Sequence, residues 1–485
     1  MTSSHGTQPT ETEFDLIVIG AGPVGENVAD RAVQGGLTAV IVESQLVGGE
    51  CSYWACMPSK TLLRPGSLLR EVQALSSTAG SVAGKLDVRA VLAARDAMTS
   101  HWKDDGQVKW LDSAGITLVR GHARLAGLKK VEVTAPDGSV TTLTARHAVA
   151  VSTGTTAIVP PIPGLADVNP WTSREATSAT EVPGRLAVIG GGVVAAEMAT
   201  AWSDLGSEVT MLVRGDSFLA GVEPRAAERV LEAMRERGVT VTMNVSAKSV
   251  ARRDDVAVLE LDNGQQLIAD KVLVATGRAP ATSDLGLASV GLKDGDWLTV
   301  DDTMLVQDVE GNWLYAVGDV NHRVLLTHQG KYQARASGDV IVARAKGTAV
   351  DDQPWGTHVA TADHAAVPQV VFTDPEVAAV GLTEAQARKA GHSVRVVDVE
   401  LSSVAAASIQ ADSFAGAARL VVDTEREVLL GATFVGPGVA ELVHGATIAV
   451  VGEVPISRLW HAVPSYPTLS EIWLRLLEAW GRPPR

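Results

Sequence analysis

The sequence predicts an α/β protein in which two βαβ units are followed by an α+β domain. A short apolar run, a glycine-rich turn and a helical pattern follow one another from residue 14, and the same succession returns from residue 185. From about residue 361 the pattern changes to short strands interrupted by helices. These three observations define the fold class.

The first unit begins with an apolar run at Phe14–Gly20, which is typical of a buried parallel strand. A helical pattern covers Glu26–Gln34, and Thr38–Glu43 reads as a second strand. Between the first strand and the helix lie Gly20, Gly22 and Gly25. Because glycine lets a backbone approach a pyrophosphate closely, and a helix N-terminus attracts anions, this turn predicts a dinucleotide site.

The acid that ends the second strand supports this interpretation. Glu43 stands eighteen residues after Gly25, where a Rossmann-like unit places an acid on a ribose hydroxyl. Strand, turn, helix, strand and acid are therefore all present in order.

The second unit repeats the pattern with a strand at Arg185–Gly190 and another at Glu208–Val213. Its fingerprint consists of Gly190, Gly192 and Ala195. Two such units imply two nucleotides. Hairpins near Val131–Val140 and Val256–Leu267 are expected as insertions, one in each unit.

The second unit also indicates which nicotinamide nucleotide binds. Val213 stands where an acid would select NADH, and Arg214 beside it favours the extra phosphate of NADPH. Asp216 is a contrary sign, whereas Arg225 is placed to assist. We therefore expect NADPH, with NADH as the alternative.

The chain has only two cysteines, Cys51 and Cys56. On a regular helix they would be about 7.5 Å apart along the axis, whereas a disulfide needs Cα atoms roughly 4.4–6.8 Å apart. The segment must therefore be tightened, and Pro58 suits a helix that begins around Cys56. Such a helix N-terminus favours a thiolate.

A metal site and two inert buried cysteines are the alternatives. A structural zinc site needs four ligands, and no further cysteine exists to supply them. A redox pair beside the first nucleotide unit therefore indicates a flavin there and a nicotinamide at the second unit, with no metal.

Composition limits the remaining choices. A chain of 485 residues predicts about three domains. A net charge of −15 argues against nucleic acid and anionic membranes as partners, and no apolar run is long enough to span a membrane. Residues 1–13 are expected to be a disordered tail without the apolar core of a signal peptide. A cysteine pair that alternates between disulfide and dithiol is typical of a reducing compartment, so we expect a cytoplasmic protein.

The expected domain boundaries follow from these patterns. We expect a first, flavin-binding domain from residues 14–160 and 282–360, a nicotinamide-binding domain from 161–281, and a C-terminal interface domain from 361–485. The last of these is expected to be a mixed antiparallel sheet with helices on one side. Its expected strands are Val367–Phe372, Arg395–Leu401, Ala418–Val422 and Leu429–Val435, and its expected helices are Thr383–Ala390 and Val439–Val451. Before this domain, a strand is expected at Trp313–Val320.

Eight motifs in order resemble those of the class I pyridine nucleotide–disulfide oxidoreductases, the group of glutathione reductase, dihydrolipoamide dehydrogenase and mercuric reductase. They are Gly20–Gly25, Cys51–Cys56 with Pro58–Lys60, Ser152–Gly154, Gly190–Gly192, Ala275–Arg278, Val317–Asp319, Thr373–Glu376 and Pro467–Glu471. The resemblance covers nearly the whole chain. It implies two Rossmann-like domains that bind FAD and NAD(P), and a C-terminal α+β dimerisation domain.

The resemblance also implies residue roles. Cys56 would lie against the flavin, and Cys51 would be the interchange thiol. Lys60, paired with Glu197, would stand near the reactive nitrogen of the flavin ring; the alternative for this pair is an ordinary solvated lysine and a surface acid. Asp319 would bind the ribityl chain, and Glu43 the adenosine ribose. Further cofactor-binding positions would be Gly154, Gly318, Gly277 and Arg278.

The C-terminal domain would form a homodimer and lend Tyr466 and Glu471 to the partner's disulfide. At position 466 disulfide reductases of this family carry histidine, and a phenol with a pKa near 10 is a poor general base at neutral pH. His461 could compensate, although an ordinary surface histidine is the simpler interpretation. Tyrosine here is similar to mercuric reductase and the soluble transhydrogenase. Because the last residues contain no cysteine pair, we do not expect mercuric reduction.

Two aromatic residues, Tyr53 and Trp54, lie inside the redox segment. They either stack against a quinone-like acceptor or pack against the flavin or a neighbouring helix.

We expect a flavoenzyme in which electrons pass from NADPH to FAD, to the Cys51–Cys56 disulfide and to a small-molecule acceptor. The alternatives are a quinone reductase or soluble transhydrogenase that uses the flavin directly, and a flavin-binding complex subunit with vestigial chemistry.

Overall fold

The computed structural model describes residues 11–82 and 84–482, and the chain forms two compact units. Unit 1 consists of the described parts of Met1–Met57, Asp96–Ala157 and Gly277–Asp363. Unit 2 consists of those of Pro58–Arg95, Ile158–Thr276 and His364–Arg485. Unit 1 therefore carries the first glycine fingerprint and both cysteines, and unit 2 the second fingerprint.

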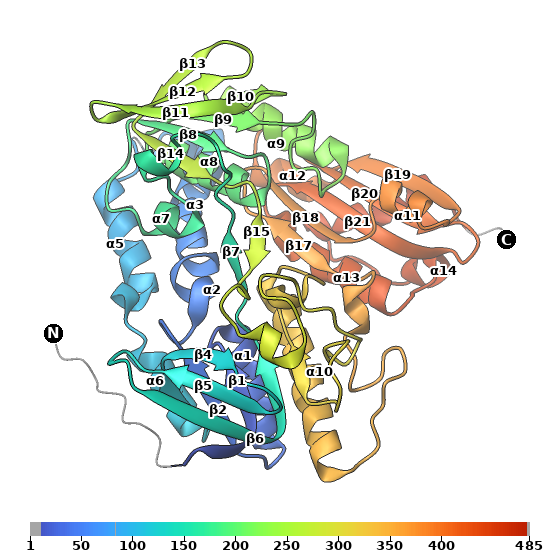
Figure 1. The fold of residues 1–485 in the computed structure, drawn as a ribbon. Helices are drawn as coiled ribbons and strands as arrows, with labels where there is room; N and C mark the ends of the chain where they lie inside the picture. The colour runs from blue at the N-terminus through green and yellow to red at the C-terminus, as the bar shows by residue number, and fades with distance from the viewer. Residues whose placement is uncertain (1–10, 83, 483–485) are drawn as a thin grey trace. The chain divides into compact units, whose positions relative to one another are not determined.

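Unit 1 is built on a seven-stranded sheet with the order β3-β2-β1-β6-β5-β4, in which β16 also pairs with β6 (Figure 1). The strands are β1 (Glu13–Ile19), β2 (Ala39–Glu43), β3 (Thr117–Arg120), β4 (His122–Leu125), β5 (Lys130–Thr134), β6 (Val140–Val151) and β16 (Leu314–Ala316). Strands β1, β2, β3, β6 and β16 pair in parallel, whereas β4, β5 and β6 form an antiparallel meander. The carboxyl ends of the parallel strands consequently share one edge of the sheet.

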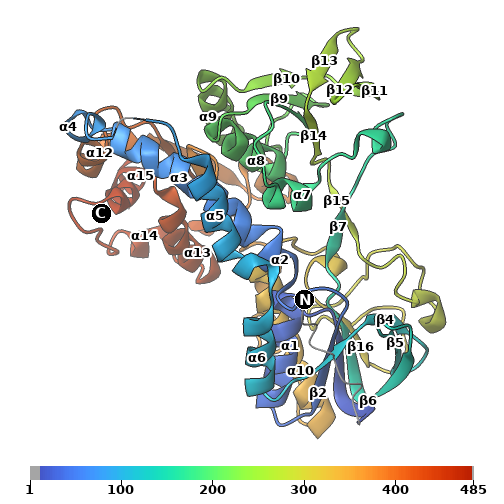
Figure 2. The ribbon, with the colours of Figure 1, turned by 90° about the vertical axis from the view of Figure 1, so that its left-hand side faces the viewer.

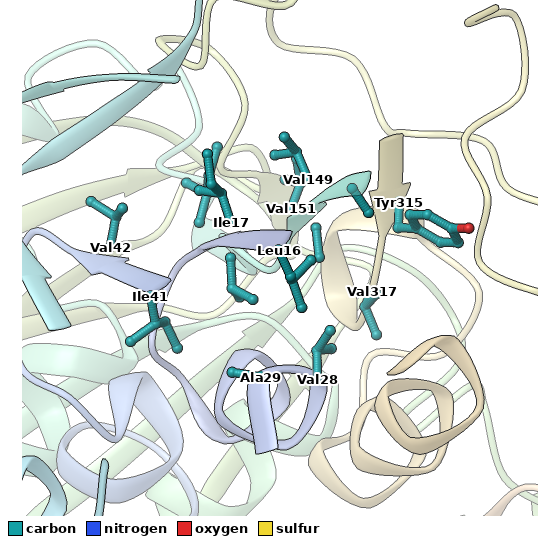
Figure 3. Packing of buried hydrophobic residues seen from close by; sticks show 14 of the residues in the cluster. Leu16, Ile17, Val28, Ala29, Ile41, Val42, Val149, Val151, Tyr315 and Val317 are labelled. Atoms are coloured by element: carbon teal, nitrogen blue, oxygen red, sulfur yellow. The ribbon is translucent and has the colours of Figure 1, made fainter. Parts of the chain in front are cut away.

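Helices α1 (Pro23–Gln34) and α10 (Thr327–Lys346) lie side by side in unit 1 (Figure 2). In Figure 3, Val28 of α1 points toward Leu16 of β1, and Ile41 and Val317 line the same core. This layer of aliphatic side chains is fully buried, which stabilises the helix–sheet contact mainly through the hydrophobic effect.

Glycines let α1 and α10 approach closely. A Cβ at Gly330 would lie 2.6 Å from Val24 Cγ2, and one at Gly338 would lie 2.5 Å from Arg31 Cβ. The early residues of one helix thus meet the early residues of the other, so the helices run parallel. Their N-termini lie at the same end of the unit.

Unit 2 contains the second nucleotide fold and the C-terminal sheet. The nucleotide fold has a parallel sheet of order β10-β9-β8-β14 and an antiparallel sheet of order β11-β12-β13. Its strands are β8 (Arg185–Ile189), β9 (Glu208–Val213), β10 (Thr240–Met243), β11 (Ala247–Arg253), β12 (Val256–Leu261), β13 (Gln266–Ala269) and β14 (Lys271–Val274). Its helices are α7 (Ser173–Ser178), α8 (Val193–Asp204) and α9 (Pro224–Glu236).

The C-terminal sheet has the order β17-β18-β21-β20-β19, and every pair in it is antiparallel. Its strands are β17 (Pro368–Val371), β18 (Glu376–Gly381), β19 (Val394–Glu400), β20 (Ala417–Asp423) and β21 (Val428–Gly436). The helices around it are α11 (Glu384–Lys389), α12 (Ala405–Gln410), α13 (Val443–Val451), α14 (Ile456–Leu459) and α15 (Ile472–Trp480).

The predicted fold class is confirmed: two nucleotide folds precede an α+β domain. Three details of the sequence prediction were wrong. The strand expected up to Val320 ends at Ala316, because Gly318 has a φ of 84° and a 3₁₀ turn begins at Asp319. Strand β18 was not expected, since its small residues and the preceding Pro375 resemble a loop. The helix expected at Val439–Val451 begins at Val443, after a 3₁₀ turn.

The predicted tail at residues 1–13 falls largely on residues 1–10, which lie outside the described residues. Glu13, which we assigned to it, is the first residue of β1 and pairs with Thr144 of β6. Within residues 11–82 and 84–482, no helix is long and apolar enough to cross a membrane.

Candidate active site

The two cysteines of unit 1 lie at the junction of two helices. Cys51 belongs to α2 (Gly49–Tyr53), and Cys56 begins α3 (Cys56–Gln73). The backbone leaves the helical conformation at Trp54, which tightens the segment as the spacing required. Both side chains are thiols in this structure, and Cys56 is near enough to affect the ionisation of Cys51.

The surroundings of the thiols have opposing effects on their ionisation. The hydrogen bond with Cys56 and burial raise the pKa of the Cys51 thiol, whereas the Thr327 hydroxyl and the charge of Lys331 lower it. Thr327 Oγ1 also lies 3.3 Å from Cys56 Sγ. Thr327 and Lys331 come from the first turns of α10 and were missed from the sequence, where only their spacing of four residues along a helix would have paired them.

The first glycine fingerprint forms a tight turn at the end of β1. A Cβ at Gly20 would lie 2.5 Å from the Ser152 carbonyl oxygen, and one at Gly25 would overlap the Gly20 carbonyl oxygen. By contrast, a Cβ at Gly22 would meet nothing within 4 Å. The turn is thus closed toward the protein and open at Gly22, where a pyrophosphate needs close approach.

Glu43 lies at the end of β2, beside this turn. Its carboxylate accepts hydrogen bonds from the backbone N–H groups of Ala21 and Gln45, both at 2.7 Å. Burial raises the pKa of Glu43, although these hydrogen bonds oppose the shift. The acid is therefore held in a fixed orientation next to the turn.

Asp319 follows Gly318 at the end of β16. Its Oδ2 accepts a hydrogen bond from Thr155 Oγ1 at 3.0 Å, and burial raises the pKa of its carboxyl. Gly154, with a φ of 69°, precedes Thr155. The loop between β6 and β7 (Thr155–Ala157) thus meets the end of β16 in unit 1.

Two hydroxyls in this loop have no partner in the described part of the chain. They are Ser152 Oγ and Thr153 Oγ1, and both are buried. Buried polar atoms are normally hydrogen-bonded, so these two fit a site completed by a polar group such as a flavin nucleotide. Together with the open Gly22 and the fixed acids Glu43 and Asp319, they show that the residues present suit FAD.

Arg278 lies in unit 1 as well. It begins β15 (Arg278–Pro280), which pairs with β7. Its Nε donates to Thr155 Oγ1 at 2.5 Å, and its guanidinium forms an ion pair with Glu50 of α2 at 3.1 Å. Arg278 therefore links the Asp319 region to the helix that carries Cys51. Gly277, which precedes it, has a φ of 147°.

The second fingerprint, in unit 2, has the same construction. A Cβ at Gly190 would overlap the Ala275 carbonyl oxygen, whereas one at Gly192 would meet nothing within 4 Å. Ala195 is buried in α8, where the third position of the fingerprint must pack closely. The second fingerprint therefore also forms an open turn at the N-terminus of a helix.

Arg214 is exposed immediately after β9, as a phosphate-binding side chain would need to be. Arg225 is engaged elsewhere, because it forms ion pairs with Glu400 and Asp398. Our expectation that Arg225 assists with the nucleotide phosphate is therefore not supported by the structure.

Lys60 and Glu197 form an ion pair in unit 2, with Lys60 Nζ 2.7 Å from Glu197 Oε2. The other oxygen of Glu197 accepts the N–H of Phe372 at 3.0 Å, and the ammonium lies 4.9 Å from the Phe372 ring centroid. Only 5% of the Glu197 side chain is exposed. The alternative of two unrelated solvated charges is wrong.

Tyr466 and Glu471 lie close together in sequence near the end of unit 2 but differ in environment. The Tyr466 ring is 75% exposed, whereas Glu471 is buried and its Oε2 has no partner among the described residues. His461 is also exposed. An exposed phenol and an unsatisfied buried carboxylate are typical of a surface that another molecule completes.

Two dinucleotide folds, a cysteine pair in the flavin-compatible unit and a paired lysine define the class of protein, an oxidoreductase with a dithiol centre. Residues 14–347 match the family model for pyridine nucleotide-disulphide oxidoreductases, and residues 367–476 match the dimerisation domain of the same family. The chain belongs to the pyridine nucleotide-disulphide oxidoreductase family.

Relatives extend over nearly the whole chain. A mercuric reductase from Staphylococcus aureus is 32% identical over 95% of this chain and 81% of its own length. A dihydrolipoyl dehydrogenase from Haloferax volcanii is 33% identical over 96% of each chain. The crystal structure of LpdA from Mycobacterium tuberculosis superposes with a TM-score of 0.82 at 25% identity, covering 96% of this chain and 99% of the other.

The fold is also that of the HOCl-induced flavoprotein disulfide reductase RclA from Escherichia coli, with a TM-score of 0.81 at 22% identity over 96% of this chain and 99% of that one. The protein is a flavin-dependent pyridine nucleotide-disulfide oxidoreductase, and FAD with NAD(P)H are its cofactors at the level of the family. The comparisons favour this function over the alternative of a quinone reductase or transhydrogenase.

Proposed function

We propose that this enzyme uses NADPH to reduce a small disulfide through a Cys51–Cys56 dithiol. The observation that supports the proposal most strongly is the position of the two thiols. They lie at the junction of α2 and α3 in unit 1, the same unit that carries the flavin-compatible turn, Glu43 and Asp319.

FAD, when bound, would supply the transfer of an electron pair from NADPH to the enzyme disulfide. Reduction of the bridge consumes two electrons and two protons and leaves two thiols. The Cys51 thiolate then attacks one sulfur of the substrate disulfide and expels the first thiol. Cys56, after losing its proton, attacks Cys51 Sγ, which re-forms the bridge and releases the second thiol.

Each predicted site residue has a place in this scheme. We propose that Gly20, Gly22, Gly25, Glu43, Gly154, Gly318 and Asp319 bind FAD, with Gly277 and Arg278 supporting the same region. Gly190, Gly192, Ala195 and Arg214 would bind the nicotinamide nucleotide. Lys60, held by Glu197, would stabilise negative charge on the reduced flavin.

The preference for NADPH rests on Arg214 and on the absence of an acid at Val213. An exposed guanidinium can bind a 2′-phosphate bidentately, whereas an acid at the end of the strand would repel it. We also propose the domain boundaries given above, and a cytoplasmic location, in which a cycling pair of cysteines would be kept reducible.

We propose that the enzyme is a homodimer in which Tyr466 and Glu471 act on the partner's disulfide. The match to the family's dimerisation domain supports an assembly through residues 367–476. The exposed Tyr466 and the unsatisfied Glu471 carboxylate agree with a surface that a second subunit completes.

The first experiment is an anaerobic titration of the purified holoenzyme with NADPH. We expect a long-wavelength thiolate–flavin absorbance band at the two-electron level, and its loss in Cys56→Ser. Steady-state turnover would be compared for oxidised glutathione, lipoamide, other small disulfides, quinones and thio-NAD, with NADPH and with NADH. Wild-type turnover of every acceptor by Cys56→Ser would contradict the dithiol route and support direct use of the flavin.

A further inference from the structure

The parallel packing of α1 and α10 places two charged side chains in the neighbourhood of the cysteine pair. Glu26 lies in the first turn of α1, and Lys331 follows Thr327 by one turn on α10. The close approach of Val24 to Gly330 fixes these turns side by side (Figure 2). At the same end of unit 1, a Cβ at Gly49 would lie 2.8 Å from Gly22 Cα, so α2 also packs against this turn.

Glu26 is an unusual residue for this position. Its Oε1 is buried and has no hydrogen-bond partner in the described part of the chain. Burial raises the pKa of Glu26 to about 7, and the nearby charge of Lys331 only partly opposes the shift, whereas that of Glu43 adds to it. The charge of Glu26 in turn contributes to the raised pKa of Tyr53 on α2. Glu26 therefore faces Lys331, Glu43 and Tyr53 from three different elements.

Lys331 lies one turn after Thr327 on the same face of α10, and the Thr327 hydroxyl is 3.3 Å from Cys56 Sγ. The charge of Lys331 lowers the pKa of both Glu26 and Cys51. Lys331 is half-buried, and within residues 11–82 and 84–482 its ammonium makes no hydrogen bond or ion pair. A cation without a direct partner is available to any negative charge that develops beside it.

A negative charge does develop there when Cys51 acts. The thiolate and not the thiol is the nucleophile in disulfide exchange, yet burial and the neighbouring Cys56 disfavour the thiolate of Cys51. The groups that oppose them are the Thr327 hydroxyl and the Lys331 ammonium. Of these two, only Lys331 carries a full positive charge.

We propose that Lys331 is a positioning residue that stabilises the Cys51 thiolate in the reduced enzyme, and that Glu26 sets the strength of this effect. Ionisation of Cys51 releases its proton to solvent, while Lys331 stays protonated. When Glu26 is neutral, the charge of Lys331 acts on the thiolate alone. When Glu26 ionises, the carboxylate offsets that charge and the stabilisation weakens.

This proposal rests on the dithiol route, so its test measures the reactivity of the Cys51 thiol itself and not enzyme turnover. The holoenzyme would be reduced anaerobically with dithiothreitol, freed of the reductant, and alkylated with iodoacetamide between pH 5 and 10. Mass spectrometry would quantify the rate at Cys51 separately from that at Cys56. The variants are Lys331→Met, which removes the charge, and Lys331→Arg, which keeps it. Lys346→Met is the matched control, because Lys346 is exposed at the far end of the same helix.

We expect Lys331→Met to move the midpoint of Cys51 alkylation upward by about one pH unit, the effect of one nearby opposite charge. The rate below the midpoint would fall about tenfold. Lys331→Arg and Lys346→Met should keep the wild-type midpoint. A Lys331→Met profile that superimposes on that of the wild type, or an equal shift in Lys346→Met, would overturn the proposal.

Glu26→Gln tests the second half of the proposal. In the wild type we expect the Cys51 profile to depart from a single ionisation near pH 7, and in Glu26→Gln to follow one ionisation with a lower midpoint. An unchanged profile in Glu26→Gln would show that the acid does not act through Lys331. Lys331→Gln repeats the charge removal should the methionine variant not retain FAD. Failure of the dithiol route itself would appear separately, as wild-type turnover in Cys56→Ser.

Discussion

Glu26 combines two features that are rarely found together in a folded protein, a buried ionisable oxygen and a position one turn from a nucleotide-binding loop. Its pKa is raised to about 7 by burial, whereas an unfolded glutamate ionises near 4.3. Between these pH values the folded protein keeps a proton that the unfolded chain has released. The free energy of unfolding therefore decreases as pH rises through this window, and the full loss is present above pH 7.

Glu26→Gln should remove this pH dependence. A neutral amide does not ionise, so we expect the free energy of unfolding of the wild type, relative to the variant, to fall by about 1–3 kcal/mol between pH 5 and pH 8. Denaturant unfolding of the holoenzyme at both pH values measures this free energy of unfolding. Glu132→Gln, at an exposed position of β5, should behave as the wild type, and equal pH dependence in all three proteins would contradict the raised pKa.

Gly338 is one of the glycines that let α1 and α10 of unit 1 pack closely. At Gly338 of α10 a methyl group would lie 2.5 Å from Arg31 Cβ and 3.2 Å from the Val28 carbonyl oxygen of α1. The first of these atoms cannot move without its backbone. The two helices would have to separate.

We expect Gly338→Ala to lower the free energy of unfolding by about 1–3 kcal/mol, the usual effect of overpacking. Because the separation would also shift α1, whose N-terminus follows the glycine turn proposed to bind FAD, the variant should bind FAD more weakly. Gly106→Ala is the control, since Gly106 lies in α6 (Asp105–Ser113) with open space around its Cβ position. It should be neutral or slightly stabilising, and equal destabilisation by both substitutions would refute the packing argument.

Helix α3 in unit 2 carries two arginines with different surroundings. Arg70 pairs with Asp204 of α8 at 2.6 Å and with Asp374, and all three side chains are largely buried. Arg64 pairs with Glu71 on the surface of the same helix, where both side chains are about half exposed. The two pairs provide a matched comparison.

Arg70→Met should destabilise the protein by about 2–4 kcal/mol, because it leaves the Asp204 carboxylate partly buried without its cation and leaves Asp374 with Arg237 alone. Arg64→Met should change the free energy of unfolding by no more than about 0.5 kcal/mol. Chemical denaturation at low and high salt distinguishes them, since salt screens only the exposed pair. Equal losses would show that the burial of Arg70 has no energetic consequence.

At the scale of the whole molecule, exposed apolar side chains near the C-terminus bear on whether two subunits associate. The C-terminal part of unit 2 exposes large apolar side chains at Ile448, Val463 and Tyr466. Exposed apolar groups of this kind are typical of protein interfaces, and they fall within the region that matches the dimerisation domain.

Introducing glutamate at both Ile448 and Val463 should convert the proposed dimer to monomers, because each charge would have to be desolvated at the interface. Light scattering after size-exclusion chromatography measures the mass of the assembly. If the dimer separates, turnover of disulfide substrates should fall, whereas FAD should stay bound. Ile268→Glu, an exposed apolar position on β13 outside that region, should remain dimeric. A monomeric wild type would contradict the assembly.

The sequence predicted the two nucleotide folds well because their signals are local. Gly20, Gly22 and Gly25 act within one turn, and alternation or runs of apolar residues mark β1 and β8 within seven residues. The pairing of Lys60 with Glu197 was also predicted, although only through a resemblance to known relatives. Strand β18 was missed, since its pairing with β21 and not its own composition makes it a strand.

The sequence alone predicted which residues carry redox and nucleotide chemistry, because residue type and short spacing indicate that chemistry. Only the tertiary structure placed Thr327 beside Cys56, with Lys331 one turn later on the same helix, and Glu26 on the helix that packs against it. These residues are separated by about 270 to 300 positions along the chain, and nothing within a local window relates them. Their proximity results from the packing of α10 on α1, which depends on how the whole of unit 1 closes around its core.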